Sequence, residues 1–331
     1  MKLATTYLGL KLSNPLIVGA SPFCDNVKLA CQLQDAGAGA LVMRSLFEEQ
    51  IDLEQRAMVR DIESATAAGG SEAASYFPEY SEYQLSLDRY LRQIQGLKAL
   101  VKVPIIASLN GCRPGGWTDF ARRFQDAGAD AIELNLYNLA TDPGISGAEV
   151  ESDMLETVGN VVGAVHIPIT VKISPFHASP VNFAMELEKA GAKGVVLFNR
   201  FYQPDFNLED FEVHPQLKLS DSSELLLRLR WLANISPHLQ GSLSATGGVH
   251  TSEDAIKALL AGAHTVQLVS VLLKHGPRYL YTLLQGMRKW MEEHGYESID
   301  QLRGALNQHR CPDPSALERA NYIRVLQSWR V

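Results

Sequence analysis

An Ala-Gly-Ala trio occurs four times in the chain, each time between a helix-like segment and a short apolar run. The central glycine suits the left-handed backbone that ends a helix, where a Cβ atom would be penalised. The runs that follow are continuously aliphatic or β-branched, which is typical of strands buried on both faces of a parallel sheet. The glycines are Gly37, Gly128, Gly191 and Gly262. The chain is therefore expected to repeat a helix–strand unit.

A second signal is a proline at the start of an apolar run. Pro15, Pro104 and Pro168 each stand in this place, where a strand needs no ladder donor. With the run after Gly241, eight strands are expected, beginning near Leu16, Ala40, Ile105, Ala131, Ile169, Gly194, Ser242 and Thr265. Helical patterns separate them, at Val27–Ala36, Ser81–Val101, Trp117–Ala127, Ala148–Val165, Pro180–Ala190, Ser223–Ile235, Ser252–Leu260 and Pro277–Glu293. Asp25 is the expected N-cap of the first helix.

Eight strand–helix units with little sequence left over predict an α/β fold, a closed (β/α)8 TIM barrel. An open doubly wound sheet is the rival, because it has the same alternation. Insertions are expected at Leu46–Tyr80 after the second strand and at Arg200–Ser220 after the sixth, on the face where barrels carry their sites. The barrel domain is expected to span residues 1–294. Residues 295–331 form a partly helical extension that packs on the barrel or on a partner.

Composition narrows the classes of function. The net charge of −7 and the lack of a Lys/Arg-rich block argue against nucleic-acid binding. The chain is 46% hydrophobic, enough for a full core, but no apolar run approaches the roughly 18 residues of a membrane span. The four cysteines form no CxxC pair, and no His/Asp/Glu cluster has metal-ligand spacing, so no metal or disulfide framework is expected. We expect a cytoplasmic protein.

Polar residues stand at the predicted carboxyl ends of the strands, where barrel enzymes place their functional groups. The set is rich in amides and cations and poor in carboxylates, and it comprises Ala20, Ser21, Arg44, Ser45, Asn110, Asn135, Lys172, Asn199, Arg200, Thr246, Gly247, Gly248 and Ser270. It contains no Ser-His-Asp arrangement and no carboxylate pair, so hydrolytic chemistry of those kinds lacks support.

A phosphate site is expected where Gly247 and Gly248 follow the seventh strand and Ser270 ends the eighth. Glycines let backbone N–H groups approach an anion, and the helix that begins near Ser252 is expected to add its positive end. A plain turn is the alternative, because Gly-Gly is common in loops.

Lys172 lies inside the apolar strand ITVKIS. An inward-pointing charged lysine needs an anionic or strongly accepting partner. A reduced flavin is one such partner, because negative charge gathers near its N1 and C2 carbonyl. The alternatives are a Schiff-base lysine, as in barrel aldolases, and a lysine whose amine snorkels to solvent from the strand end.

Asn135 and Asn199 end the fourth and sixth strands. Each side chain can donate and accept at once, which suits a heterocycle with alternating N–H and C=O groups. The alternative is an amide that satisfies loop backbone. An aromatic cluster in the first insertion is expected to pack that segment onto the barrel rather than to cover a ligand; it comprises Tyr76, Phe77, Tyr80 and Tyr83.

Four motifs together resemble the dihydroorotate dehydrogenase family, which includes related dihydropyrimidine dehydrogenase domains. They are NPLIVGAS from Asn14, IELNL at Ile132–Leu136, VKISPF at Val171–Phe176 and SATGGVHTSEDAIKALLAGAHTVQL at Ser244–Leu268. The last is long and specific. The resemblance implies an FMN-binding barrel that oxidises dihydroorotate to orotate in pyrimidine synthesis, and a homodimer is expected on the same ground.

The resemblance also implies roles for individual residues. The expected flavin contacts are Ala20, Ser21, Arg44, Ser45, Asn135 and Lys172, and the expected phosphate contacts are Gly247, Gly248 and Ser270. The substrate is expected to meet Arg44, Asn135 and Asn199. Lys172 and the residue at position 138 are the expected catalytic positions.

The chain departs from the family at the position of the base. Members carry a catalytic Cys or Ser shortly after the asparagine of the fourth strand, and Asn138 stands there instead. An amide cannot take a proton at neutral pH. Arg44 replaces the family's lysine after the second strand, which keeps the charge in a different shape. Possible substitutes for the base are Cys112, Tyr137, Asp142 and Ser146.

These observations predict an FMN-dependent oxidoreductase that passes hydride between a small cyclic amide, such as a dihydropyrimidine, and flavin N5. The alternatives are a sugar-phosphate aldolase or isomerase that uses Lys172, and a flavin-binding paralogue with a different substrate or no turnover. The sequence contains no GxGxxG motif, so a nicotinamide would require a partner protein.

Overall fold

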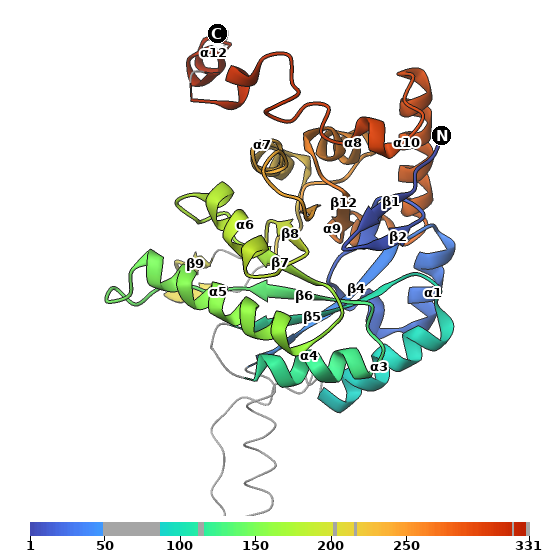
Figure 1. Cartoon of the computed structure of the whole chain (residues 1–331), viewed down its shortest axis with the longest axis vertical. Helices are drawn as coiled ribbons and strands as arrows, with labels where there is room; N and C mark the ends of the chain where they lie inside the picture. Colours follow the sequence, from blue (N-terminus) through green and yellow to red (C-terminus); the bar gives the residue numbers. More distant parts are fainter. Residues whose placement is uncertain (49–86, 112–115, 201–203, 215–216, 320, 329–331) are drawn as a thin grey trace, which may run out of the picture.

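The computed structural model describes residues 1–48, 87–111, 116–200, 204–214, 217–319 and 321–328. Eight parallel strands close a barrel in the order β11-β12-β3-β4-β5-β6-β7-β8 (Figure 1). The strands are β3 (Leu16–Val18), β4 (Ala40–Phe47), β5 (Ile105–Gly111), β6 (Ala131–Leu136), β7 (Ile169–Ile173), β8 (Gly194–Leu197), β11 (Ser242–Thr246) and β12 (Thr265–Leu268). The predicted TIM barrel is confirmed, and each strand begins at the residue expected from the sequence.

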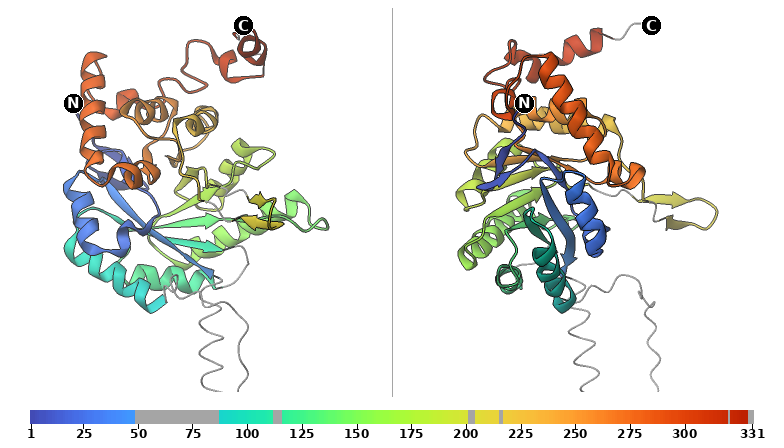
Figure 2. Two further views of the ribbon diagram at one scale, coloured as in Figure 1. Left: turned by 180° about the vertical axis from the view of Figure 1, so that it is seen from behind. Right: turned by 90° about the vertical axis from the view of Figure 1, so that its right-hand side faces the viewer.

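Helices surround the barrel (Figures 1 and 2). They are α1 (Val27–Asp35), α3 (Leu87–Leu100), α4 (Trp117–Asp126), α5 (Gly147–Ala164), α6 (Pro180–Lys189), α7 (Leu225–Ile235), α8 (Ser252–Ala261) and α10 (Tyr279–Glu293). The glycines of the four repeats have positive φ angles of 103°, 98°, 104° and 121°, as the left-handed helix ends require. The backbone thus turns from helix to strand where the Ala-Gly-Ala trio predicts.

The predicted N-cap of α1 was wrong by one residue. The side chain of Asn26, not of Asp25, accepts hydrogen bonds from the backbone N–H groups of Lys28 and Leu29. Asp25 belongs to the short helix η1 (Pro22–Asp25) and forms an ion pair with Arg44. The carboxylate is therefore engaged with the barrel wall instead of the helix end.

A small hairpin closes the amino-terminal end of the barrel. It consists of β1 (Thr5–Tyr7) and β2 (Leu10–Leu12), and Tyr7 is completely buried. The Tyr7 hydroxyl donates to Thr170 Oγ1 at 3.3 Å, and burial raises the pKa of this phenol, helped by the charge of Glu133. With this floor in place, the carboxyl ends of the strands form the mouth of the barrel.

Two further segments extend from the barrel. Between β8 and α7, the strands β9 (Asp205–Asn207) and β10 (Glu212–His214) pair as an antiparallel hairpin. After α10 come α11 (Ile299–Leu302), η3 (Pro314–Leu317) and α12 (Asn321–Gln327). Most of the predicted insertion after the second strand, with its aromatic cluster, lies outside the described residues. Among those described, no helix has both the length and the apolar character to cross a membrane.

Candidate active site

Three polar side chains form one row across neighbouring strands at the mouth. Asn110 on β5 is in register with Asn135 on β6, and Asn135 is in register with Lys172 on β7. All three are buried, with exposed fractions of 6–8%. The parallel register explains the row, because residues at equivalent depth in adjacent strands share one layer of the barrel.

Lys172 points into the barrel and meets a carboxylate. Its Nζ lies 3.5 Å from Oε1 of Glu133, which is fully buried. Gln267 on β12 donates from Nε2 to the other oxygen of Glu133 at 2.6 Å. The snorkelling alternative for Lys172 is therefore wrong, since the ammonium is paired inside the barrel.

Glu133 and Gln267 were not among the predicted site residues. The signal for Glu133 was present in IELNL, because Glu133 and Asn135 alternate with apolar residues at the period of a strand. Side chains two residues apart on a strand share a face, so Glu133 lies one layer below Asn135. Gln267 carried no comparable local signal, because its contact joins residues 134 positions apart.

Several buried amide atoms at this end of the barrel lack a hydrogen-bond partner among the described residues. They are Oδ1 of Asn135, Nδ2 of Asn199 and Oε1 of Gln267. A buried polar atom without a partner costs about 1–3 kcal/mol, so such atoms call for an explanation. Asn135 offers an acceptor and Asn199 a donor. A ligand that carries both an N–H and a C=O group would satisfy them.

The Gly247-Gly248 turn requires glycine at both positions. Their φ angles are +84° and +79°. A Cβ atom on Gly247 would lie 2.9 Å from Nη2 of Arg228, and one on Gly248 would collide with the backbone of Leu225. This close packing places a buried arginine against the turn, where Nε of Arg228 donates to the Thr246 carbonyl at 3.0 Å. Sequence reasoning missed Arg228, which lies in an ordinary amphipathic helix.

Ser270 lies beside the loop that follows the β9–β10 hairpin. Its hydroxyl oxygen accepts from the Ser220 backbone N–H at 3.2 Å. Lys274 donates to the Ser220 carbonyl at 2.8 Å. Ser270 and Lys274 both lie on the short helix α9 (Ser270–His275), and both bind the backbone of Ser220.

Helix α8, which was expected to offer its positive end to an anion, carries a carboxylate of its own at that end. Thr251 caps this helix, and Asp254 completes a capping box. Oδ2 of Asp254 accepts from the backbone N–H groups of His250 and Thr251, at 3.0 and 3.1 Å. Asp254 thus places a carboxylate at this helix terminus, so an anion bound there would meet a like charge.

The predicted site residues that follow β3 or lie on β4 have hydrogen-bond or ion-pair partners within the chain. The Ser21 hydroxyl donates to the Gly19 carbonyl at 2.8 Å, and the hydroxyls of Ser45 and Ser108 are 2.8 Å apart. Arg44 is paired with Asp25. Burial raises the pKa of Asp25, while the nearby Arg44 charge acts in the opposite direction.

Two of the candidate bases, Ser146 and Asp142, take part in local structure instead. Ser146 is the N-cap of α5 and accepts from the Glu149 backbone N–H. Asp142 is exposed and accepts from Gly144 N–H at 2.8 Å. Asn138 and Tyr137 are half-buried at the carboxyl end of β6, and Cys112 lies outside the described residues. Ser146 and Asp142 thus have structural roles.

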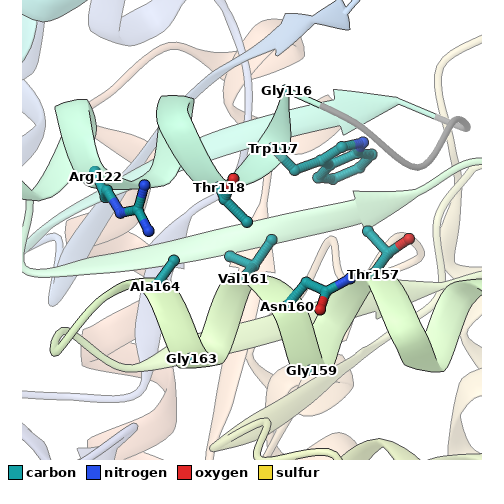
Figure 3. A pocket seen from close by; sticks show the side chains of 10 residues that line it. All are labelled: Gly116, Trp117, Thr118, Arg122, Thr157, Gly159, Asn160, Val161, Gly163 and Ala164. Atoms are coloured by element: carbon teal, nitrogen blue, oxygen red, sulfur yellow. The ribbon is translucent and has the colours of Figure 1, made fainter.

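A separate cavity of about 480 Å³ lies between α4 and α5 (Figure 3). Trp117 and Thr118 line it from α4, and Thr157, Asn160 and Val161 line it from α5. It belongs to the outer helical layer, whereas barrel sites are built at the strand ends. The described residues also contain no group of three His, Cys, Asp or Glu side chains that could hold a metal ion.

The closed parallel barrel and the polar residues at its mouth are typical of TIM-barrel enzymes, whose active sites lie at the carboxyl ends of the strands. The family model for dihydroorotate dehydrogenase matches residues 2–291. The chain belongs to the dihydroorotate dehydrogenase family, as its motifs predicted.

Curated relatives are similar to this chain at low identity. A putative dihydroorotate dehydrogenase A (fumarate) of Aeropyrum pernix is 27% identical over 61% of this chain and 67% of its own length. The catalytic subunit of dihydroorotate dehydrogenase B (NAD(+)) of Thermoplasma volcanium is 25% identical over 91% and 97%. The NAD-dependent dihydropyrimidine dehydrogenase subunit PreA of Escherichia coli is 23% identical over 94% and 78%. These identities make the chain a divergent member of the family.

Proposed function

We propose that this protein is an FMN-dependent oxidoreductase acting on a CH–CH bond of a small cyclic amide. The observation that carries the proposal is the set of unpaired buried amide atoms, Asn135 Oδ1 and Asn199 Nδ2, at the same strand ends as Lys172. An acceptor, a donor and a cation match the edge of an isoalloxazine and a cyclic amide stacked on it. FMN, when bound, supplies the two-electron chemistry through its N5 atom.

The residues at the mouth fit this cofactor. The positive φ angles of Gly247 and Gly248 suit a turn whose backbone N–H groups bind a phosphate, and Ser270 follows β12, the strand that pairs with β11. Arg228 brings a guanidinium against the turn, with the Glu224 carboxylate 3.9 Å from it. In this arrangement the turn holds the phosphate, while Asn135 and Lys172 hold the ring system. Ala20, Ser21 and Ser45 form the wall on the β3–β4 side.

Glu133 gives Lys172 a defined place. Glu133, which accepts a hydrogen bond from Gln267, holds the ammonium at the base of the mouth, where the lysine side chain is only 10% exposed. A fixed cation there stabilises negative charge on the ring, and the adjacent carboxylate limits the size of that effect. The pair also counts against the aldolase alternative, because Glu133 pairs with the charged lysine and an imine-forming lysine reacts in its neutral form.

The substrate class follows from the charges at the mouth. Arg44 already forms an ion pair with Asp25, so a substrate carboxylate would have to compete for it. Asn199 offers an unpaired N–H to a ring carbonyl. These contacts favour a neutral dihydropyrimidine as substrate. Dihydroorotate, the substrate that the family name implies, is the compound to compare with it. Relatives named dihydropyrimidine dehydrogenase support the same choice.

Asn138 affects the rate rather than the class of reaction. It can orient a substrate by hydrogen bonds but cannot remove a proton. Loss of a positioned base typically costs about 10²–10⁴-fold in rate. We therefore propose slow turnover of dihydroorotate unless another group at the mouth takes the proton.

The test uses the FMN-loaded protein under anaerobic conditions. Dihydrouracil or dihydroorotate is added, and the flavin absorbance reports reduction of the cofactor. The proposal predicts that a dihydropyrimidine bleaches the flavin, and that dihydrouracil, which is neutral, does so at a higher rate than dihydroorotate. A protein that binds no FMN contradicts the proposal. A protein that binds FMN but is bleached by neither compound supports the flavin-binding paralogue instead, and borohydride trapping of a substrate imine would support the aldolase.

A further inference from the structure

A further cavity, of about 620 Å³, lies at the amino-terminal end of the barrel, opposite the mouth. Residues at the starts of four strands, or directly before them, form its wall; they are Ile169, Lys193, Ser242 and His264. The β1–β2 hairpin, the end of α5 and helix α11 complete the wall. A cavity of this volume can hold a small organic molecule. Because the candidate active site lies at the other end of the strands, this amino-terminal cavity is separate from it.

Two cationic side chains line the amino-terminal cavity. The guanidinium of Arg303, directly after α11, pairs with Asp300 at 2.9 Å, and its Nη1 donates to Thr5 Oγ1 at 3.5 Å. These contacts fix the side chain, of which 26% is exposed. Lys193 is exposed, and its ammonium has no ion-pair partner among the described residues. The cavity thus offers one fixed cation and one cation that binds no carboxylate.

The carboxylates around the cavity do not cancel this positive charge. Asp300 pairs with Arg303, but its side chain is 70% exposed, so water screens the pair. Glu188 lies beside the cavity, and its Oε1 accepts from the backbone N–H groups of Gln240 and Gly241 at 3.0 and 2.5 Å. The residues that line the cavity therefore carry two cations and one carboxylate, which favours an anionic ligand.

His264 adds a neutral hydrogen-bond donor to the wall. Its Nδ1 accepts from the Leu243 backbone N–H at 3.0 Å, so the proton of the neutral ring is on Nε2. Burial keeps the ring neutral by lowering its pKa to about 4, and the charge of Arg303 acts in the same direction. Within the described part of the chain, Nε2 has no hydrogen-bond acceptor, and it is not sealed from solvent. This N–H group is therefore available to a ligand in the cavity.

We propose that the amino-terminal cavity binds a small organic phosphate, whose phosphate group is held by Arg303, Lys193 and the Nε2–H group of His264. These donors come from three separate segments of the chain, and a phosphate monoester presents three terminal oxygens and a charge of about −1.5 to −2 near pH 7. The carbon part of the ligand packs on the apolar residues of the wall; they are Leu8, Val162, Val165, Ile167 and Pro168. No residue of the mouth takes part, so the proposal does not depend on the proposed function.

A titration with phenyl phosphate as the probe, followed by NMR of the histidine ring nitrogens, tests the proposal. The His264 signals report binding in this cavity, whereas His250, two residues after Gly248, reports any phosphate bound at the mouth. For the full-length wild type we expect a saturable shift of the His264 signals. Arg303→Gln and Lys193→Gln should raise the dissociation constant read there at least about tenfold and about threefold, because each loses a charged contact to the phosphate.

Arg288→Gln, at an exposed arginine of α10, is the matched control and should bind the probe as wild type does. Phenol has the ring without the charge, and benzoate has a planar carboxylate; each should bind at least about tenfold more weakly than phenyl phosphate. Circular dichroism verifies that each variant is folded, and the exposed position of Lys193 makes its replacement the milder of the two.

Three results would each overturn the proposal. The first is a wild-type protein whose His264 signals show no saturable shift with phenyl phosphate. The second is equal affinity at His264 in wild type, Arg303→Gln and Lys193→Gln. The third is benzoate or phenol bound there as tightly as phenyl phosphate, which would show that the cavity does not select a phosphate.

Discussion

Lys172 and Glu133 form a buried ion pair directly below the candidate flavin site. The lysine side chain is 10% exposed and the glutamate side chain is not exposed at all. A buried pair of this kind is strongly coupled, because removal of one partner leaves an uncompensated charge in a medium of low dielectric. At the scale of single residues, this pair controls the charge that the proposed cofactor would experience.

Glu133→Gln is expected to raise the reduction potential of bound FMN. The change removes a negative charge beside Lys172 and keeps the size of the side chain, so the lysine stabilises the reduced ring more strongly. We expect an increase of tens of millivolts, since about 30 mV corresponds to 1.4 kcal/mol for a two-electron couple. Equilibration with redox dyes measures it. Glu156→Gln, an exposed residue of α5, is the matched control. A potential equal to that of wild type would show that Glu133 does not act on the ring.

At the scale of elements, the amino-terminal ends of β11 and β12 are joined through His264. Its Nδ1 accepts from the Leu243 backbone N–H at 3.0 Å, so this nitrogen is unprotonated in the fold. Burial lowers the pKa of His264 to about 4, and the charge of Arg303 acts in the same direction. Protonation would therefore break a contact that joins the two strands.

His264 is expected to make the protein less stable in mild acid. Its pKa is about 4 in the fold and 6.5 for an ordinary histidine side chain, so the unfolded chain binds more protons between these two pH values. The free energy of unfolding then rises with pH between about 4 and 6.5, by about 3 kcal/mol at most from this residue. Urea unfolding of wild type and His264→Gln at pH 4.5 and 7.5 checks it. An equal pH dependence in the two proteins would contradict this role.

The elements themselves could be predicted because their signals are local. A helix ends at a glycine with positive φ, and a buried parallel strand is an unbroken apolar run, so both can be recognised within about ten residues. The capping box of Thr251 and Asp254 was equally local, as a Thr-x-x-Asp pattern, but its consequence for anion binding was missed. A helix that carries its own carboxylate in the first turn is a less favourable site for an anion.

The contacts of the candidate site could not be predicted because they join distant parts of the chain. Arg44 was expected at the ligand, and its ion pair with Asp25 depends on how η1 lies against β4. Arg228 lies against the glycine turn only because α7 packs beside β11. Sequence periodicity indicates which face a residue takes but not which residue of another element it meets.

At the scale of the whole molecule, the two ends of the barrel differ: one end is closed, and the other carries the candidate site. The hairpin with Tyr7 closes the floor, and the unpaired amides and the glycine turn lie at the mouth. The β9–β10 hairpin and α12 extend beyond the barrel. The closing of the barrel followed from the count of eight strand–helix units, whereas the exposed apolar surfaces depend on where the extensions lie in space.

The central claim is that the mouth binds FMN with its phosphate at the Gly247-Gly248 turn. The most direct measurement is a titration of the apoprotein with FMN, followed by flavin fluorescence, for wild type, Gly248→Ala and Gly96→Ala. A Cβ on Gly248 would collide with Leu225, whereas one on Gly96 in α3 meets open space. We predict saturable binding to wild type and to Gly96→Ala, and affinity at least about tenfold weaker for Gly248→Ala. No saturable binding to wild type, or equal affinity in all three proteins, would contradict the claim.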